Sequence, residues 1–215
     1  MNQQQKRILI LAPHTDDGEF GCGGTIAKLI EAGSSVYYIA FSSCEKSLPP
    51  GMDPNTLKIE LRNATKILGI KDENVITFDF PVRDFPQYRQ DILELMIQLS
   101  KDIEPDIVFA PSINDIHQDH HTIAMETMRA FKRVTILGYE LPWNNFVFRN
   151  QVFFQLDKSH IDIKIAATKC YQSQVARDYS DPNYIEGIAR AHGVQIGLQY
   201  AEVFESERYI IKSLL

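Results

Sequence analysis

The chain contains 215 residues, of which 44% are hydrophobic and 23% are charged, and its formal net charge is −6. This is the composition of a globular protein, and the acidic balance argues against a nucleic-acid backbone or an anionic membrane as the main partner. The three cysteines are odd in number and widely spaced, which favours neither a disulfide framework nor a thiolate zinc site.

The N-terminal residues do not resemble a targeting segment. Only about six apolar residues precede Pro13, too few for the core of a signal peptide and far too few for a membrane span. We therefore expect a cytoplasmic protein with no membrane span. No Pro/Gly/Ser-rich linker, charge block or repeat marks a boundary, so we expect a single domain over residues 1–215.

Apolar runs alternate with helical periodicity through the first 140 residues. Strands are predicted at 8–12, 36–41, 75–78, 107–110 and 134–139, and helices at 25–32, 55–68, 87–101 and 120–132. This alternation predicts right-handed βαβ units and a Rossmann-like, doubly wound, mostly parallel sheet. Ligands bind such sheets at the carboxyl ends of the strands, where the chain order reverses.

The last third of the chain is less regular. Strands are predicted at 151–156, 203–204 and 209–211, and helices at 161–172 and 183–191. We therefore expect an α/β core over residues 1–140 and a smaller α+β extension over 141–215 that completes the site. An aromatic and amide-rich loop at 142–146 is suited to a sugar ring, and it is equally compatible with ordinary packing.

A polar stretch, Pro13–Gly24, follows the first predicted strand and carries His14, Asp16 and Asp17 beside several glycines. An imidazole and a carboxylate three residues apart can converge on one metal ion, while the second carboxylate stays free to handle a proton. The alternative is a solvated turn whose glycines only let the next helix start close to the strand. These residues alone favour neither interpretation.

A second polar stretch, Ser112–His121, follows the fourth predicted strand and contains His117, Asp119 and His120. The turn after strand one and the loop after strand four are expected to open onto the same edge of the sheet. Clustered His and Asp residues in two such loops favour a metal site. The alternative is that Asp119 caps a helix that starts at His120, while His117 and His121 are simply exposed.

The motif His14-Thr15-Asp16-Asp17, with Gly23-Gly24 after it, and the motif His117-Gln118-Asp119-His120 resemble the two signatures of the PIG-L/LmbE family of zinc-dependent de-N-acetylases. The resemblance implies that His14, Asp17 and His120 hold zinc and that Asp16 is the general base. It also implies that His117 faces the substrate carbonyl and that Asp119 orients His117. The implied activity is removal of an N-acetyl group from a GlcNAc-type amino sugar.

In the mechanism expected from this resemblance, zinc-bound water attacks the amide carbonyl, Asp16 takes its proton, and a protonated His117 stabilises the oxyanion. The substrate is a small N-acetylated sugar, with Arg83, Trp143 and Asn144 as candidate contacts. Fe²⁺ or another divalent ion could replace Zn²⁺. We expect no nucleic-acid partner, and a homo-oligomer is compatible with the sequence.

Two other classes of function stay open at this stage. Two histidines and one carboxylate also form the facial triad of non-haem Fe(II) enzymes, so His14, Asp17 and His120 could serve redox chemistry. A non-catalytic sugar-binding protein is the second alternative, and it would show no metal-dependent hydrolysis. A nucleotide-binding module is disfavoured because Gly21-Cys22-Gly23-Gly24 is not a G-x-G-x-x-G motif.

Overall fold

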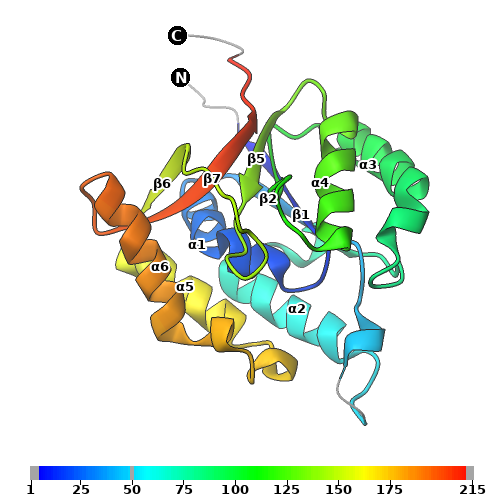
Figure 1. Ribbon diagram of the computed structural model, residues 1–215, viewed down its shortest axis with the longest axis horizontal. Helices are drawn as coiled ribbons and strands as arrows, with labels where there is room; N and C mark the ends of the chain where they lie inside the picture. The colour runs from blue at the N-terminus through cyan, green and yellow to red at the C-terminus, as the bar shows by residue number, and fades with distance from the viewer. Residues whose placement is uncertain (1–4, 49–50, 212–215) are drawn as a thin grey trace.

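The computed structural model describes residues 5–48 and 51–211 and contains a seven-stranded sheet (Figure 1). The strands are β1 (Arg7–Ala12), β2 (Ser35–Ala40), β3 (Val75–Thr77), β4 (Ile107–Pro111), β5 (Thr135–Tyr139), β6 (Val152–Leu156) and β7 (Tyr200–Arg208). The helices are α1 (Asp17–Glu31), α2 (Thr56–Leu68), α3 (Arg89–Ile103), α4 (Gln118–Ala130), α5 (Lys158–Thr168) and α6 (Pro182–Gln195). The predicted α/β class is confirmed. Within the described ranges, no helix has the length and apolarity that a membrane crossing requires.

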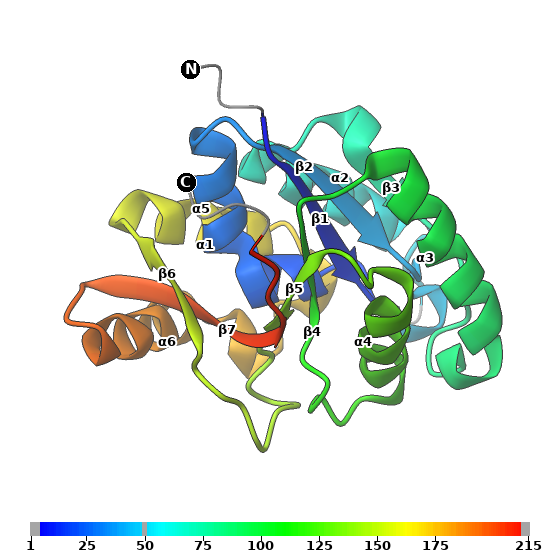
Figure 2. The ribbon, with the colours of Figure 1, turned by 90° about the horizontal axis from the view of Figure 1, so that it is seen from above.

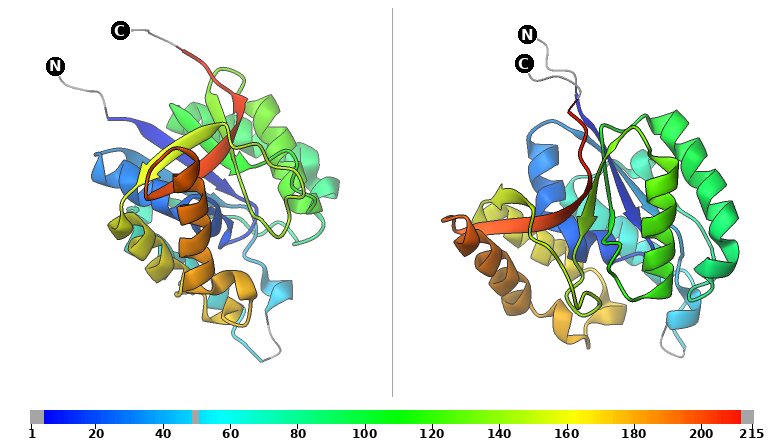
Figure 3. Two further views of the ribbon diagram at one scale, coloured as in Figure 1. Left: turned by 60° about the vertical axis from the view of Figure 1, so that its left-hand side comes forward. Right: turned by 45° about the horizontal axis from the view of Figure 1, so that its top comes forward.

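Helices cover both faces of the sheet, as Figures 2 and 3 show. Ile8 and Ile10 of β1 pack with side chains of α1, α2, α5 and α6 on one face. Leu9 and Leu11, which alternate with them, pack with α3 and α4 on the other face. A strand buried on both sides needs a continuous apolar run, and this is why residues 8–12 contain no polar residue.

The strand order is β3-β2-β1-β4-β5-β7-β6, and β1 to β5 pair in parallel while β7 is antiparallel to both of its neighbours. The chain winds outward in one direction from β1 and in the other from β4, so the order reverses between these two strands. The segments that follow β1 and β4 therefore meet at one edge of the sheet. This confirms the expected placement of the two polar stretches.

Helix α1 begins at Asp17, so the prediction of a loop up to Gly24 was wrong. The glycines lowered the apparent helix propensity, but they are required by packing. A Cβ on Gly18 would lie 2.6 Å from the Tyr38 ring, and one on Gly21 would lie 2.4 Å from the Tyr139 ring. The first turns of α1 thus lie directly against buried tyrosines.

Helix α1 is kinked at Cys22, whose φ of −147° is not helical. After the kink, a carboxylate from β7 serves as the acceptor for two backbone amides. Glu202 accepts hydrogen bonds from the backbone N–H of Gly24 at 3.1 Å and of Thr25 at 2.6 Å. Lys164 of α5 pairs with the same carboxylate at 2.6 Å and compensates its buried charge.

Several boundaries in the rest of the chain differ from the predictions, and α5, predicted at 161–172, is Lys158–Thr168. Strand β7 runs without interruption to Arg208, and residues 209–211 are not a strand. Glu202 and Glu205 are buried within β7, and these two carboxylates masked its apolar pattern. Helix α6 extends to Gln195, and α4 begins two residues earlier than expected, at Gln118.

The close packing of α1 yields a prediction for stability. We expect Gly21→Ala to lower the free energy of unfolding by about 1–3 kcal/mol, because the new methyl group overlaps the ring of the fully buried Tyr139. Gly187→Ala in α6 is the matched control, since a Cβ there meets no atom within 4 Å and should stabilise by about 0.5–1 kcal/mol. Urea unfolding of both variants measures the difference, and equal midpoints would contradict the packing argument.

Candidate metal and catalytic site

The turn after β1 and the loop after β4 form one wall of a cavity of about 270 Å³ at the carboxyl edge of the sheet. Of the predicted site residues, all but Asp119 line it. The lining consists of His14, Thr15, Asp16, Asp17, Phe20, Cys44, Leu57, Val82, Arg83, His117, His120, Trp143, Asn144, Gln174, Arg177 and Tyr179. The three predicted substrate contacts therefore lie in the same cavity as the predicted metal ligands.

Three donor atoms converge in this cavity. His14 Nδ1 and His120 Nε2 are 3.1 Å apart, and Asp17 Oδ2 lies 3.3 Å from the first and 3.4 Å from the second. The backbone N–H of His14 donates to Asp17 Oδ2 at 2.8 Å and orients the carboxylate. Donor atoms about 2.0–2.1 Å from a tetrahedral zinc are separated by roughly 3.3–3.4 Å, so the triangle fits such an ion.

A carboxylate occupies the remaining nitrogen of each of these two imidazoles. Asp119 Oδ2 lies 3.0 Å from His14 Nε2, and Asp115 Oδ2 lies 2.8 Å from His120 Nδ1. Carboxylates accept hydrogen bonds, so each neutral ring carries its proton on the outer nitrogen and directs a lone pair at the other ring. Two lone pairs and a carboxylate oxygen that face one another repel unless a cation lies between them.

The titration behaviour of the ligand-free site agrees with this arrangement. Burial lowers the pKa of His14, but the neighbouring acidic groups of Cys44 and Asp17 and the hydrogen bonds to Asp119 and Asp17 raise it well above its usual value. Burial would raise the pKa of Asp17, yet the nearby imidazoles of His120 and His14 hold it well below its usual range. The site thus attracts positive charge, which a proton supplies when no metal is bound.

The structure gives the Asp119 carboxylate a different partner from the one that the resemblance implied. It contacts His14, and it also accepts the backbone N–H groups of Arg83 at 2.6 Å and Phe85 at 3.2 Å. Only its backbone reaches His117, whose Nδ1 accepts the Asp119 N–H at 3.2 Å. The reason is that His117, and not Asp119, caps helix α4.

His117 also differs from the protonated form that the sequence suggested. Burial, followed by the electrostatic influence of the neighbouring His120 and His14, lowers its pKa to about 4, so the ring is neutral near pH 7. Because its Nδ1 accepts the Asp119 N–H, the proton of the neutral ring is on Nε2. The ring stacks on His120 at a centroid distance of 4.5 Å. One of its ring nitrogens lies within 4.8 Å of a ring nitrogen of His14 and of His120, so the three could ligate one metal ion.

Asp16 is half-buried beside Asp17 and lines the cavity. Burial, followed by the charge of Asp17, raises its pKa to about 6. A carboxylate with a pKa near the operating pH is a better general base than an ordinary solvated aspartate. Their surroundings thus give the two adjacent carboxylates different pKa values, and Asp16 is the stronger base.

A buried network, which the sequence analysis missed, holds the catalytic turn from behind. Tyr38 and Tyr171 both place their hydroxyl groups on the Thr15 carbonyl oxygen, at 3.0 and 2.7 Å, and both also contact the Glu19 carboxyl group. Burial raises the pKa of Glu19 to about 8, so it is protonated near pH 7. Phenols from such distant parts of the sequence cannot be identified as partners from a pattern.

The loop after β5 supplies the opposite wall. Trp143 stacks on Tyr179 with a centroid distance of 4.0 Å and an interplanar angle of 15°, and Phe20 meets both rings edge to face. The Asn144 carbonyl oxygen accepts the Ile116 N–H at 3.2 Å, which ties this loop to the one after β4. Asn144 thus has a structural contact in addition to its place in the cavity wall.

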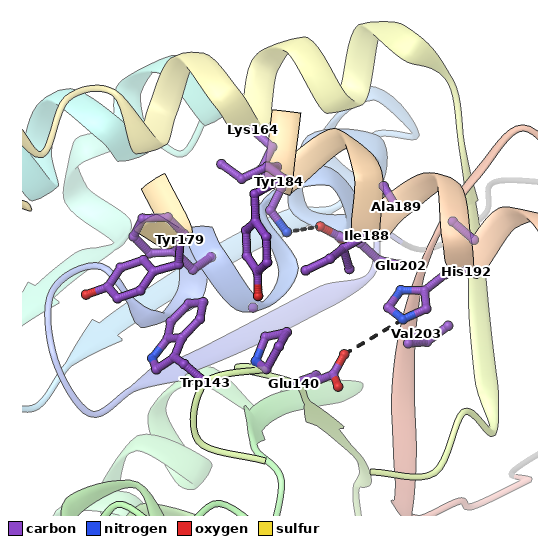
Figure 4. Close-up of a pocket in the computed structure, with 15 residues that line it drawn as sticks. Glu140, Trp143, Lys164, Tyr179, Tyr184, Ile188, Ala189, His192, Glu202 and Val203 are labelled. Atoms are coloured by element: carbon purple, nitrogen blue, oxygen red, sulfur yellow. Dashed lines mark hydrogen bonds and ion pairs between the residues drawn. The ribbon is translucent and has the colours of Figure 1, made fainter. Parts of the chain in front are cut away.

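A smaller cavity of about 40 Å³ shares Trp143 and Tyr179 with the first cavity (Figure 4). Its polar groups face each other in pairs: Lys164 with Glu202 at 2.6 Å, and His192 with Glu140 at 3.8 Å. It has room for only a few water molecules and no converging donors of the metal type. Of these two cavities, the one of about 270 Å³ has the room for a sugar ring.

The sequence analysis also missed Asp115, Gln174, Arg177 and Tyr179. Asp115 belongs to the same loop as His117 and could have been identified as a partner for a histidine ligand, since such ligands usually have one. The other three come from the segment between α5 and α6, outside the two signature motifs. Only the fold brings that segment to the cavity.

Comparison with known proteins assigns the family. A family model described as PIG-L, GlcNAc-PI de-N-acetylase, matches residues 9–131. The uncharacterized deacetylase YaiS of Escherichia coli (strain K12) is 30% identical over 176 residues, which covers 79% of this chain and 92% of the relative. The chain therefore belongs to the PIG-L family of metal-dependent de-N-acetylases. The predicted class of enzyme, a hydrolase of N-acetyl amide bonds, is confirmed.

More distant relatives extend this result. The diacetylchitobiose deacetylase of Thermococcus kodakarensis is 25% identical over 221 residues, which covers 92% of this chain and 81% of the relative. The solved N,N'-diacetylchitobiose deacetylase from Pyrococcus horikoshii superposes with a TM-score of 0.78 at 21% identity, over 94% of this chain and 84% of that one. GalB of Pseudomonas putida KT2440, a 4-carboxy-2-hydroxymuconate hydratase, gives 0.79 at 21% identity, over 98% and 100%. The fold alone therefore does not define the reaction.

The outer carboxylates yield the second prediction. We expect Asp119→Asn and Asp115→Asn each to weaken metal binding about 10- to 100-fold, because an amide cannot hold the imidazole in the same tautomer with the same charge. Competition with a chromophoric chelator measures the affinity without reference to activity. Asp106→Asn, at the opposite end of β4, is the control and should leave it unchanged. Wild-type affinity in both site variants would contradict this role.

Proposed function

We propose that the chain removes the acetyl group from an amino sugar of the N-acetylglucosamine type in a reaction that depends on zinc or a similar divalent ion. The observation that carries this proposal is the triangle of His14, Asp17 and His120 donor atoms with Asp16 beside it. The relatives named as diacetylchitobiose deacetylases support the class of substrate. We also propose that residues 1–215 act as one domain, since Trp143, beyond the core, lines the cavity.

The proposed metal ligands are His14 Nδ1, Asp17 Oδ2 and His120 Nε2. Two imidazoles and one carboxylate form a donor set typical of catalytic zinc, and the same set can bind Fe(II). When bound, the ion supplies Lewis acidity at the acetyl carbonyl and lowers the pKa of a coordinated water. The remaining steps belong to side chains of the chain itself.

Asp16 is the proposed general base. It accepts the proton of the attacking water as the C–O bond forms at the acetyl carbon, and it is then protonated and able to act as an acid. Collapse of the tetrahedral intermediate breaks the C–N bond, and the proton passes from Asp16 or His117 to the leaving amine. The products are acetate and the free amino sugar.

His117 is the proposed hydrogen-bond donor to the acetyl oxygen. Its neutral ring directs Nε2–H away from the helix, because Nδ1 is occupied by the Asp119 N–H. A neutral donor of fixed orientation stabilises the developing oxyanion without the cost of burying a second cation beside a metal. The cap of α4 therefore sets the direction of a catalytic hydrogen bond.

Removal of the metal tests the proposed function directly. We expect dialysis against a strong chelator to abolish acetate release from N-acetylglucosamine conjugates, and Zn²⁺ or Fe²⁺ to restore it without oxygen or a cosubstrate. Acetate is measured by a coupled assay under anaerobic conditions. A requirement for oxygen would replace the hydrolytic assignment by redox chemistry, and full activity after verified metal removal would contradict the metal-dependent mechanism.

The role of Asp16 has its own test. We expect Asp16→Asn to reduce kcat by about 10²- to 10⁴-fold while the bound metal per chain stays at the wild-type level, because the amide cannot accept the proton of water. Asp91→Asn, on an exposed position of α3, controls for the change in charge. Loss of metal in Asp16→Asn would identify Asp16 as a ligand instead, and wild-type turnover would exclude it as the base.

A further inference from the structure

Helix α2 buries one carboxylate on the face that it turns toward the core. Glu60 is 7% exposed and lies on the same side of the helix as Leu57 and Leu61, which belong to the core. The ion pairs of α2 found among the described residues are those of Lys58 and Arg62, and neither involves Glu60. A carboxylate among apolar side chains costs free energy unless it binds donors, so packing alone does not explain it.

Both donors to Glu60 come from one serine in the short 3₁₀ turn Gln172–Gln174, which lies between α5 and α6. The Ser173 N–H donates to Glu60 Oε1 at 3.0 Å, and the Ser173 hydroxyl group donates to Glu60 Oε2 at 2.6 Å. An ionised carboxylate can only accept hydrogen bonds. The hydrogen of the Ser173 hydroxyl group is therefore directed at Glu60.

This bond sets the orientation of the neighbouring amide. Once the Ser173 oxygen has donated its hydrogen to Glu60, it can only accept from a second partner, and Gln174 Nε2 lies 3.3 Å from it. The nitrogen of the Gln174 amide must therefore face Ser173, and the oxygen must not. Gln174 lines the catalytic cavity, and its Oε1 and second N–H are left for a ligand there.

The backbone at Gln174 is fixed relative to the catalytic turn. Tyr171, three residues earlier, places its hydroxyl group 2.7 Å from the carbonyl oxygen of Thr15. The Gln174 carbonyl oxygen accepts the Arg177 N–H at 3.0 Å and the Ser180 hydroxyl group at 3.1 Å. Both the backbone and the amide of Gln174 are thus held in place before any ligand binds, which lowers the entropic cost of binding.

The surroundings of the Gln174 amide are suited to a sugar. Tyr179 and Trp143, which stack on each other, line the same cavity. Aromatic rings pack against the C–H faces of a sugar, and the hydroxyl groups of the sugar need hydrogen-bond partners beside those rings. An amide with one free acceptor and one free donor can serve as such a partner.

Resting on the proposed function, we propose that Gln174 binds a hydroxyl group of the amino sugar, and that Ser173 and Glu60 are positioning residues for its amide. Gln174 Oε1 accepts the hydroxyl hydrogen, and the free N–H can donate to a hydroxyl oxygen. The amide takes no part in breaking the C–N bond. A site that binds a hydroxyl group in this way discriminates against a sugar that lacks it, because the amide then has no partner.

The test compares the methyl glycoside of N-acetylglucosamine with its 3-deoxy, 4-deoxy and 6-deoxy analogues. Acetate release by the metal-loaded enzyme gives kcat/KM for each sugar. We expect the wild type to use one deoxy sugar about 30-fold less well than the parent, and Gln174→Ala to narrow that ratio to about threefold. The other two ratios should stay unchanged. Because the lost contact is one of binding, Gln174→Ala should raise KM for the parent sugar and leave kcat nearly unchanged.

Two variants test the positioning residues. Glu60→Gln sets an amide N–H against one of the two Ser173 donors, and Ser173→Ala removes the acceptor of the Gln174 amide. We expect each variant to reduce the discrimination against the same deoxy sugar about threefold to tenfold, mainly through KM, with the bound metal per chain unchanged. Wild-type ratios in both variants would overturn the positioning roles. A merely structural role would leave the ratios of the folded enzyme unchanged.

Gln172→Ala is the matched control for Gln174→Ala. Gln172 belongs to the same turn, but its side chain is exposed and donates to the Lys169 carbonyl oxygen at 2.7 Å, and it does not line the cavity. This variant should keep the wild-type KM and all three ratios. If Gln172→Ala and Gln174→Ala change the ratios equally, the turn acts only as structure and the proposal is overturned.

A wild type that uses all four sugars equally well, or a discrimination that survives Gln174→Ala, overturns the proposal while the deacetylase function stands. If no sugar releases acetate, the proposed function fails, and calorimetric binding of the same four sugars decides about Gln174. One missing hydroxyl group that weakens binding about tenfold in the wild type, and not in Gln174→Ala, supports the hydroxyl site. Binding that Gln174→Ala leaves unchanged, or no binding, overturns it.

Discussion

The carboxylate of Asp119 is the contact on which the geometry of the site depends. It is fully buried, it fixes the tautomer of His14 through Nε2, and it accepts the backbone N–H groups of Arg83 and Phe85. One side chain thus joins the turn after β1, the loop before α3 and the start of α4. A buried carboxylate needs several hydrogen-bond donors to offset its desolvation. Here the donors belong to the segments whose relative positions define the site.

The arrangement of α1 follows from the same requirement for rigid support. Its glycines let the helix approach Tyr38 and Tyr139, and the Tyr38 and Tyr171 hydroxyl groups then hold the Thr15 carbonyl directly before Asp16 and Asp17. Both carboxylates therefore lie on backbone that is fixed from behind by buried groups. Asp16 and Asp17, the proposed base and metal ligand, can keep different pKa values only if each carboxylate stays in its own surroundings.

Much of the fold could be predicted from the sequence because apolar runs and helical periodicity report burial directly. The strand at residues 8–12 and the segment after β4 that carries His117 and His120 were placed correctly for this reason. The errors occur where polar groups are buried or glycines are packed: Glu202 and Glu205 hid β7, and the glycines hid the start of α1. The partner of Asp119 could not be predicted, because Asp119 and His14 lie 105 positions apart and only the β1–β4 pairing joins them.

The two parts of the site also differ in what the family shares. The family match spans residues 9–131, which contain His14, Asp17 and His120, whereas Trp143, Arg177 and Tyr179 lie beyond it. The same fold also serves a hydratase, so the reaction depends on the side chains that a chain places on it. The proposed metal ligands thus lie within the span of the family match, and much of the opposite cavity wall comes from segments beyond it. Arg83 connects the two, because it lies within the span that the family shares but on strained backbone at the wall of the cavity.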